Sequence, residues 1–340
     1  MSPATARDAP DGVQITIAAT GDLLIHQPVW QRALAVGGGR RYDFRPLLRA
    51  VRPYLRSADM AICHVETPLR PGPPAGYPLF STPTALAPAI HWAGFDVCST
   101  ASNHTLDGGQ AGIDSTVSAL DRAGVRHAGS YRSAAGARRI ALLTVKGVRV
   151  AFLSYTTLLN GLRPPHPWSV NVASARRILS DARRARRLGA DVVIVSLHWG
   201  QEYDHTPTPA QRQLADRLTR SPDVTAVIGQ HVHVVQPIRR VNGKIVVFGE
   251  GNLVSNQTAA CCPAATQDGM IVLLTVNVRG TRARVERARY VPIWVRHPDF
   301  TVLPVGLALR HRLADLRALR QSWQRTVSVV GRSVAQPTAP

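Results

Sequence analysis

The pattern of apolar and polar positions predicts an alternation of buried strands and helices. Short runs with the composition of buried strands are 14–21, 58–63, 95–100, 148–155, 191–197, 224–228 and 244–248. Helical periodicity separates several of these runs, for example over 113–123 and 209–220. Because strands alternate with helices through residue 230, we expect an α/β protein.

The C-terminal third of the chain has a different pattern. Residues 270–278 and 283–291 alternate apolar and polar side chains, which predicts a terminal β-hairpin. Residues 309–324 predict a basic amphipathic helix, and 326–340 have the composition of a loosely held tail. Strands added after the α/β part are therefore expected to be antiparallel.

Polar residues of a few chemical types follow the apolar runs. They are Asp22, Glu66, Asn103 with His104, His198, His231 with His233, and Asn252. Each lies just past the end of a predicted strand, and in open α/β sheets that edge is where loops converge and ligands bind. The repetition over six strand ends is the signal, since one such residue alone would be unremarkable.

These residues offer carboxylate, amide and imidazole donors without a thiolate. This donor set suits Mn, Fe, Zn or Ni and argues against a structural zinc site. An extended segment at His231-Val-His233 would present both rings on the same side. Asp22 and Glu66 would neutralise two divalent cations held roughly 3.5–4 Å apart, an arrangement that supports in-line displacement at phosphorus.

Several stretches resemble a known family. Gly21-Asp22, Asn103-His104, His198 and Gly229-Gln-His-Val-His233 are similar to the scattered motifs of calcineurin-like metallophosphoesterases. The CapA family, named for poly-γ-glutamate capsule synthesis, is more similar still over roughly residues 14–256. Its motifs resemble Gly21-Asp-Leu-Leu, Val65-Glu-Thr-Pro-Leu, Ser102-Asn-His-Thr-Leu-Asp-Gly-Gly, His198-Trp-Gly-Gln-Glu-Tyr203, Gly229-Gln-His-Val-His-Val-Val-Gln-Pro237 and Phe248-Gly-Glu-Gly-Asn-Leu253.

The resemblance implies a fold and a set of roles. The fold would be an αββα sandwich of two mixed sheets flanked by helices. The implied ligands of two divalent metals (Mn, Fe or Zn) are Asp22, Glu66, Asn103, His198, His231 and His233. His104 would protonate a leaving group, and Glu202 and Asn252 would shape the pocket.

The chain departs from the superfamily pattern at two positions. Leu24 stands where the Asp-x-His motif has a histidine, and His26, two residues further on, is a candidate ligand or a residue of the pocket edge. Gln230 stands where another residue type is usual. His64 is not included in the ligand set, because strand alternation directs it away from Cys63 and Val65.

The motifs also divide the chain. We expect a disordered N-terminus at 1–13 and a CapA-like metallophosphoesterase domain at 14–256. Strands at 257–305 would complete the same domain, and 306–340 would form the basic helix and tail.

Neither a membrane span nor a signal peptide is evident, since no apolar run reaches about eighteen residues and residues 1–12 are polar. We therefore expect a protein that is cytoplasmic or peripheral to the membrane, unless an upstream export segment is missing. Relatives in the family are commonly membrane-anchored or extracytoplasmic.

The four cysteines do not indicate a disulfide scaffold. Cys63 and Cys98 lie in apolar runs and are expected to be buried thiols. Cys261 and Cys262 are neighbours, and neighbours rarely bridge because the geometry is strained.

The chain is strongly basic, with a net charge of +20. A cluster of arginines lies within 176–187 on one predicted helix, and it is either a solvated helix face or a contact for a polyanion or anionic lipid. No aromatic residues interleave with these arginines, so we expect no sequence-specific nucleic-acid partner.

Three functions remain open from the sequence. The first is a metal-dependent role in the synthesis, transport or processing of an anionic capsule polymer such as poly-γ-glutamate, for which a membrane-associated synthesis complex would be a partner. The second is general hydrolysis of phosphoesters by a dinuclear metal site. The third is a non-enzymatic polymer-binding or scaffold role, which Leu24 keeps open.

Overall fold

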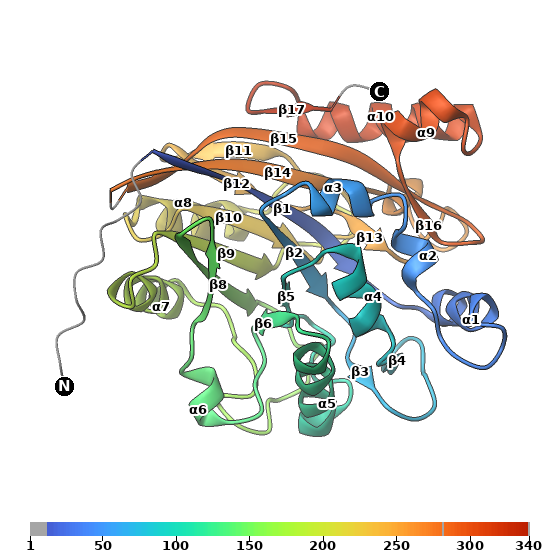
Figure 1. Ribbon diagram of the computed structural model, residues 1–340, viewed down its shortest axis with the longest axis horizontal. Coiled ribbons are helices and arrows are strands. Elements are labelled where there is room, and N and C mark those ends of the chain that lie inside the picture. Colours follow the sequence, from blue (N-terminus) through green and yellow to red (C-terminus); the bar gives the residue numbers. More distant parts are fainter. Residues whose placement is uncertain (1–11, 281, 339–340) are drawn as a thin grey trace.

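Two β-sheets face each other in the computed structural model, which describes residues 12–280 and 282–338, and helices cover their outer faces (Figure 1). The large sheet runs in the order β16 (Thr301–Pro304), β15 (Arg282–Arg296), β14 (Asp268–Arg279), β1 (Val13–Leu23), β2 (Met60–Val65), β5 (Val97–Ser99), β6 (Arg126–Ala128), with β13 (Asn252–Val254) beside β1 and β17 (Ala335–Pro337) beside β15. The smaller sheet runs β11 (Ile238–Val241), β12 (Lys244–Val247), β10 (Ala226–Gln230), β9 (Val192–His198), β8 (Val148–Thr156), β7 (Ala141–Val145). A separate pair contains β3 (Leu69–Arg70) and β4 (Thr82–Pro83).

The helices form the outer layers. Those on the outer face of the large sheet are α1 (Gln27–Val36), α2 (Arg45–Leu48), α3 (Arg52–Arg56), α4 (Leu86–Ala93) and the end of α5 (Gly109–Arg122). The smaller sheet packs on α7 (Ala175–Arg187) and α8 (Pro209–Arg220). The remaining helical segments are α6 (Ala134–Ala137), η1 (Ala264–Gln267), α9 (Val305–His311) and α10 (Leu316–Val330). The expected αββα sandwich of two mixed sheets is confirmed.

Strand β1 shows why the apolar runs are continuous. Ile15, Ile17 and Ala19 point into the core between the two sheets, whereas Ala18 and Leu23 point into the core beneath the helices. A strand that is buried on both faces has no polar alternation, because successive side chains meet different apolar layers.

The strands that carry the candidate site are parallel and in register. Asp22 at the end of β1 lies opposite His64 of β2, and β2 continues in parallel with β5. In the other sheet, Gln230 of β10 lies opposite His198 of β9. The carboxyl ends of these strands therefore meet at one edge of the sandwich.

The C-terminal part agrees with the sequence in one element and differs in another. The hairpin expected over 270–278 and 283–291 is present as β14 and β15, and β14 pairs along β1. The single helix expected over 309–324 is wrong, because the chain turns at Arg312, which has φ 52°, and a new helix begins. The Asp315 side chain accepts a hydrogen bond from the backbone N–H of Ala318 and so caps α10.

Parts of the two expected terminal segments lie outside the described residues. Of the expected disordered segment 1–13, residues 1–11 lie outside the described residues, and 12–13 lead into β1. In the expected tail, α10 continues to Val330 and β17 pairs with β15, while residues 339–340 lie outside the described residues.

The expectation that Cys63 and Cys98 are free thiols is wrong. The register of β2 against β5 places them directly opposite each other with a Cα–Cα distance of 4.5 Å, and they form a disulfide. The pairing depends on which strands are neighbours, and strand order is not visible in the linear pattern. Cys261 and Cys262 are free, as expected.

A glycine permits the close approach that sets Asp22 in place. A Cβ atom on Gly21 would lie 1.7 Å from the backbone oxygen of Gly251, and this oxygen accepts the N–H of Asp22 at 3.1 Å. Any side chain at this position therefore requires the segment around Gly251 to move.

Gly21→Ala is expected to lower the free energy of unfolding by about 3 kcal/mol or more, because the clash is with backbone. Chemical denaturation measures this. The matched control is Gly112→Ala within α5, where the nearest atoms would be 3.7 Å away and alanine favours the helix. Equal effects from both substitutions would contradict this explanation.

Candidate metal centre

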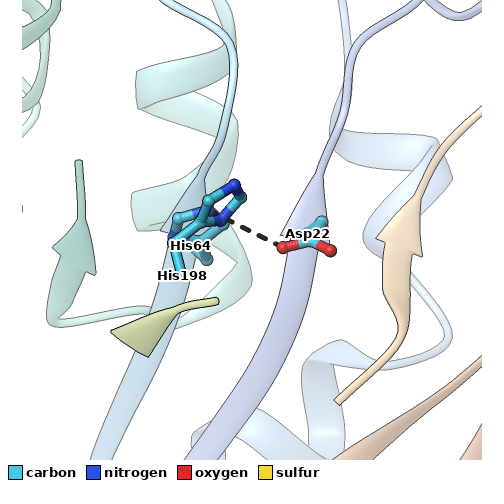
Figure 2. Close-up of side chains that lie close together, drawn as sticks. All are labelled: Asp22, His64 and His198. Carbon is cyan, nitrogen blue, oxygen red and sulfur yellow. Dashed lines mark ion pairs between the residues drawn. The ribbon is translucent and has the colours of Figure 1, made fainter. Parts of the chain in front are cut away.

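Both sheets deliver side chains to one edge of the sandwich. Strands β1 and β2 of the large sheet contribute Asp22, His64 and, just past the end of β2, Glu66. Strand β9 of the smaller sheet contributes His198. Figure 2 shows Asp22 facing His64, with the His198 ring stacked against the His64 ring. Side chains from distant parts of the chain thus converge, as the sequence predicted.

The convergence is close enough for shared cations. Four groups of three residues have ligand atoms within 4.8 Å of one another: Asp22, His64 and His198; Glu66, His198 and His231; Glu202, His231 and His233; Asp22, Glu66 and His233. Asp22, Glu66 and His198 each belong to two groups, and so do His231 and His233. Overlapping groups of this kind fit two neighbouring cations with shared ligands.

Individual contacts support this arrangement. The Nδ1 atom of His233 lies 3.3 Å from Oδ2 of Asp22, and its Nε2 atom lies 3.7 Å from Oε1 of Glu66. The Nε2 atom of His198 lies 2.9 Å from the amide oxygen of Asn103. The amide oxygen of Asn103 is therefore directed at the same space as the imidazoles.

The site is buried, and several of its polar atoms have no hydrogen-bond partner among the described residues. Asp22, Glu66 and His198 are at most 1% exposed. Both nitrogens of His64 and both carboxylate oxygens of Glu66 are buried with no hydrogen-bond partner among the described residues. One ring nitrogen of His198 and one of His231 are likewise buried with no hydrogen-bond partner among the described residues. A buried polar atom without a partner costs about 1–3 kcal/mol, so this donor set fits cations that would supply the missing partners.

The electrostatics separate the histidines into two kinds. Burial, followed by the nearby His233, lowers the pKa of His231 to about 3. Burial also lowers the pKa of His64 to about 4. Burial opposes the charged form of His233 as well, yet Glu66 and Asp22 outweigh it and raise its pKa to about 9. Most of the rings are therefore neutral at pH 7, which is the form that binds metal.

The loop after β10 reaches the site in an unexpected conformation. His231 and His233 have φ of 95° and 57°, so the extended segment predicted from the sequence is wrong. Both rings still converge, with centroids 6.0 Å apart, because two left-handed residues turn the loop back while Val232 is buried beneath it. Such strain costs roughly 1–3 kcal/mol per residue and is typical of functional sites.

His64 is the ligand candidate that the sequence analysis missed. Its Nε2 atom lies 3.7 Å from Oδ1 of Asp22. The signal was present in the sequence, because a strand directs residues two apart to the same side, and Glu66 had already been selected. Alternation away from Cys63 and Val65 thus argues for His64 and not against it.

His26 lies outside the four groups of candidate ligands. Its Nδ1 atom accepts the backbone N–H of Asn256, and its ring meets the edge of Phe80. Leu24 is buried in the core. His64, from the neighbouring strand, is an imidazole that lies beside Asp22.

The side chain of Gln230 forms two buried hydrogen bonds, which give this unusual residue a structural role. Its side-chain oxygen accepts the hydroxyl of Ser196, and its amide donates to the buried carboxyl of Glu250 at 2.8 Å. Burial raises the pKa of Glu250 to about 8. The Gln230 side chain thus bonds to residues behind the candidate ligands and belongs to none of the four ligand groups.

His104 and Asp107 form a pair at the border of the site. Oδ2 of Asp107 lies 2.8 Å from Nδ1 of His104 and also accepts the backbone N–H of Phe80. This contact fixes the proton of neutral His104 on Nδ1 and leaves Nε2 for other partners. His104 lines a cavity of about 480 Å³ next to the metal ligands.

The other two predicted pocket residues are also here. Glu202 joins His231 and His233 in one ligand group and lines the cavity. The amide oxygen of Asn252 lies 3.0 Å from Nδ1 of His233, and its amide nitrogen donates to the side chain of Gln257. Asn252 therefore orients a ligand candidate from behind.

Metal uptake should depend on His64. We expect added Mn²⁺ to raise the melting temperature of metal-free protein, and His64→Ala to weaken binding about tenfold or more. Thermal unfolding and equilibrium dialysis measure the two effects. His91→Ala, on the exposed side of α4, should behave like the natural protein. If His64→Ala binds Mn²⁺ as tightly as the control, His64 is not a ligand.

Metal affinity should rise with pH. Metal-free His233 holds its proton up to about pH 9, and a metal must displace that proton. Because the folded pKa exceeds the ordinary value of 6.5, protonated His233 stabilises the metal-free fold fully below about pH 6.5, and this contribution is lost toward pH 9. Because burial also raises the pKa of Glu66 well above its ordinary value, calorimetry in buffers of different ionisation enthalpy should detect at least about one proton released per chain at pH 7. Absence of proton release would contradict the assignment.

Comparison with known proteins agrees with this geometry. The family described as bacterial capsule synthesis protein PGA_cap matches residues 16–257. Capsule biosynthesis protein CapA of Bacillus anthracis is 28% identical over 279 residues, which cover 79% of this chain and 65% of the relative. PGA biosynthesis protein CapA of Bacillus subtilis (strain 168) is 30% identical over 55% of this chain and 48% of the relative. The chain thus spans less than two thirds of the length of these relatives.

Solved structures share the fold at lower sequence similarity. Calcineurin-like phosphoesterase YfkN from Bacillus subtilis superposes with a TM-score of 0.55 at 15% identity, over 93% of this chain and 98% of that one. A 5'-nucleotidase precursor from Thermus thermophilus gives a TM-score of 0.51 at 12% identity, over 93% and 59%. With the family match over most of the chain, the protein belongs to the bacterial capsule synthesis protein PGA_cap family and has a calcineurin-like phosphoesterase fold.

Proposed function

We propose that the chain is a metal-dependent phosphoester hydrolase acting in the synthesis or processing of an anionic capsule polymer such as poly-γ-glutamate. One observation carries the chemical part of the proposal: carboxylate, amide and imidazole groups from both sheets converge with buried atoms that have no partner among the described residues. The capsule context is supported by the family match and by the relatives named for capsule and PGA biosynthesis.

The residues that would hold two divalent cations are Asp22, His64, Glu66, Asn103, His198, His231 and His233. Oxygen and nitrogen donors of this kind suit Mn, Fe or Zn. Such cations supply Lewis acidity at the phosphoryl oxygens and a water-derived nucleophile at neutral pH.

His104 is placed to act on the leaving group. Asp107 holds its Nδ1 atom, so a protonated His104 has Nε2 free to donate to an oxygen in the cavity. Phe80 contacts the His104 ring edge to face at 4.7 Å and limits its rotation. This arrangement is suited to general acid catalysis, which contributes typically about 10²–10⁴-fold.

The cavity indicates which part of a substrate lies there. Its walls include Tyr77, Leu79, Leu162 and Tyr203, all partly exposed, together with acidic Glu202. Among the described residues, no arginine or lysine lines it, although the chain carries a charge of +20. The group that leaves from phosphorus is therefore expected to be uncharged, with apolar or planar parts.

The scaffold alternative loses its main support. It relied on Leu24 at a position where the superfamily has a histidine, but His64 lies beside Asp22 instead. This contact supports a ligand set that does not need a histidine at position 24.

His104→Gln tests the proposed chemistry. Protonation matters most for poor leaving groups, so the variant should lose about 10²-fold or more in kcat on an alkyl phosphodiester and much less on a nitrophenyl phosphodiester. Steady-state kinetics with Mn²⁺-loaded protein measure both losses. Arg183→Ala, an exposed change on α7, is the control and should leave both rates unaltered. Lack of turnover of both substrates by the natural protein would overturn the proposal.

A further inference from the structure

A second pocket, remote from the metal ligands, lies at the end of α5. It has a volume of about 270 Å³ and is bounded by the last turns of α5, by β6, by α6 and by the start of β7. Figure 1 shows α5 and α6 in the lower part of the view, near β6, which is the last strand of the large sheet. None of the described residues lines both this pocket and the cavity beside the metal centre.

The side chains of this pocket are predominantly basic. Arg126, Arg132 and Arg139 line it, together with His127. Asp121 is the only carboxylate among the described lining residues, and it is engaged by Arg132 at 3.0 Å and by His127 at 3.2 Å. Within the described part of the chain, the guanidinium groups of Arg126 and Arg139 form no ion pair. The pocket thus has a surplus of fixed positive charge.

The charge belongs to the arginines and not to the histidine. Burial lowers the pKa of His127, and Arg126 and Arg132 lower it further, although Asp121 opposes them. Like charges gathered in a concave site repel one another and attract an anion. Guanidinium groups bind carboxylates through two parallel hydrogen bonds, so Arg126 and Arg139 can each receive such a group.

The arginine cluster on α7 is a weaker candidate for the same role. Arg184 pairs with Asp181, and Arg177 pairs with Asp181 and donates to Asn171. The Arg186 side chain donates to the backbone oxygens of residues 190 and 191. These arginines stabilise the helix and its connection to β9, and they line none of the pockets described above.

We propose that the pocket at the end of α5 binds the carboxylate groups of an oligomeric anion and holds it apart from the metal centre. The assignment of an anion follows from the unpaired arginines, and the choice of a γ-linked glutamate chain rests on the proposed function. Asp107 precedes the first turn of α5 and Asp121 lies in its last turn, so the two sites are separated by roughly 20 Å along the helix. An anion bound in the pocket is therefore held away from the metal centre, and an oligomer, unlike a single small anion, can place one carboxylate on Arg126 and another on Arg139.

Binding of a γ-linked glutamate oligomer to the full, metal-loaded chain tests the proposal. Calorimetry should show binding that weakens steeply with salt, with inorganic phosphate binding more weakly than the oligomer. The double variant R126Q/R139Q should weaken oligomer binding about tenfold or more, because two charge-assisted contacts are lost. R126K/R139K keeps the charge but not the paired hydrogen bonds. Its affinity for the oligomer should lie between those of the natural chain and of R126Q/R139Q.

The matched control removes the same charge elsewhere. Arg122 and Arg138 are exposed neighbours that do not line the pocket, and R122Q/R138Q should bind within about twofold of the natural chain. Equal losses in both double variants would mean nonspecific attraction and would overturn the proposal, as would equal binding by R126Q/R139Q and the natural chain. Phosphate binding as tightly as the oligomer would also overturn the assignment of a carboxylate ligand.

The outcome is independent of hydrolysis. The oligomer contains no phosphoester, so its binding is measured without turnover. Absence of phosphoesterase activity would therefore overturn the proposed function and leave the pocket standing. Unchanged oligomer affinity in R126Q/R139Q would overturn the pocket and leave the proposed hydrolysis standing.

Discussion

The structure depends on a cluster of buried ionisable side chains whose polar atoms do not all find hydrogen-bond partners among the described residues. Asp22 and Glu66 place two carboxyl groups where they are almost fully buried, and burial keeps most of the imidazoles around them neutral. Among the described imidazoles, His233 has its pKa raised, to about 9, and burial raises the pKa of Glu66 well above its ordinary value, so the metal-free site retains protons that cations would displace. Buried charges of this kind are stable only when paired or bound to metal. The ends of both sheets are therefore best understood as the walls of a cation site.

The sandwich supplies what this site needs. Parallel strands bring their carboxyl ends to one edge, and the register of β1 with β2 and of β9 with β10 fixes which side chains face one another. The apolar core between the sheets holds the two edges rigidly, because the strands β2, β9 and β10 are buried along their whole length. Close backbone contact at Gly21 and left-handed turns at His231 and His233 then complete the geometry. Local strain is tolerated here because the surrounding packing is extensive.

The sequence predicted much of this because strand ends are local signals. An apolar run followed by Asp, His or Asn can be recognised without knowing the fold, and Asp22, His198 and His233 were found in this way. The features that were missed depend on long-range pairing. His64 meets Asp22 through the register of β2 with β1, and the Cys63–Cys98 disulfide requires β2 beside β5. Both positive φ values belong to a loop whose path is set by tertiary packing. The break between α9 and α10 was missed because the amphipathic pattern continues across Arg312.

The acidic and basic regions of the molecule lie apart from each other. The cavity beside the metal ligands contains no arginine or lysine among its described lining residues, whereas the pocket at the other end of α5 concentrates arginines with one carboxylate. The most direct test of the cation site is X-ray diffraction at the Mn absorption edge from crystals grown with Mn²⁺. Two anomalous peaks roughly 3.5–4 Å apart are expected, enclosed by Asp22, His64, Glu66, His198, His231 and His233. Diffraction from Mn²⁺-grown crystals without peaks between these side chains would contradict the assignment of a metal centre.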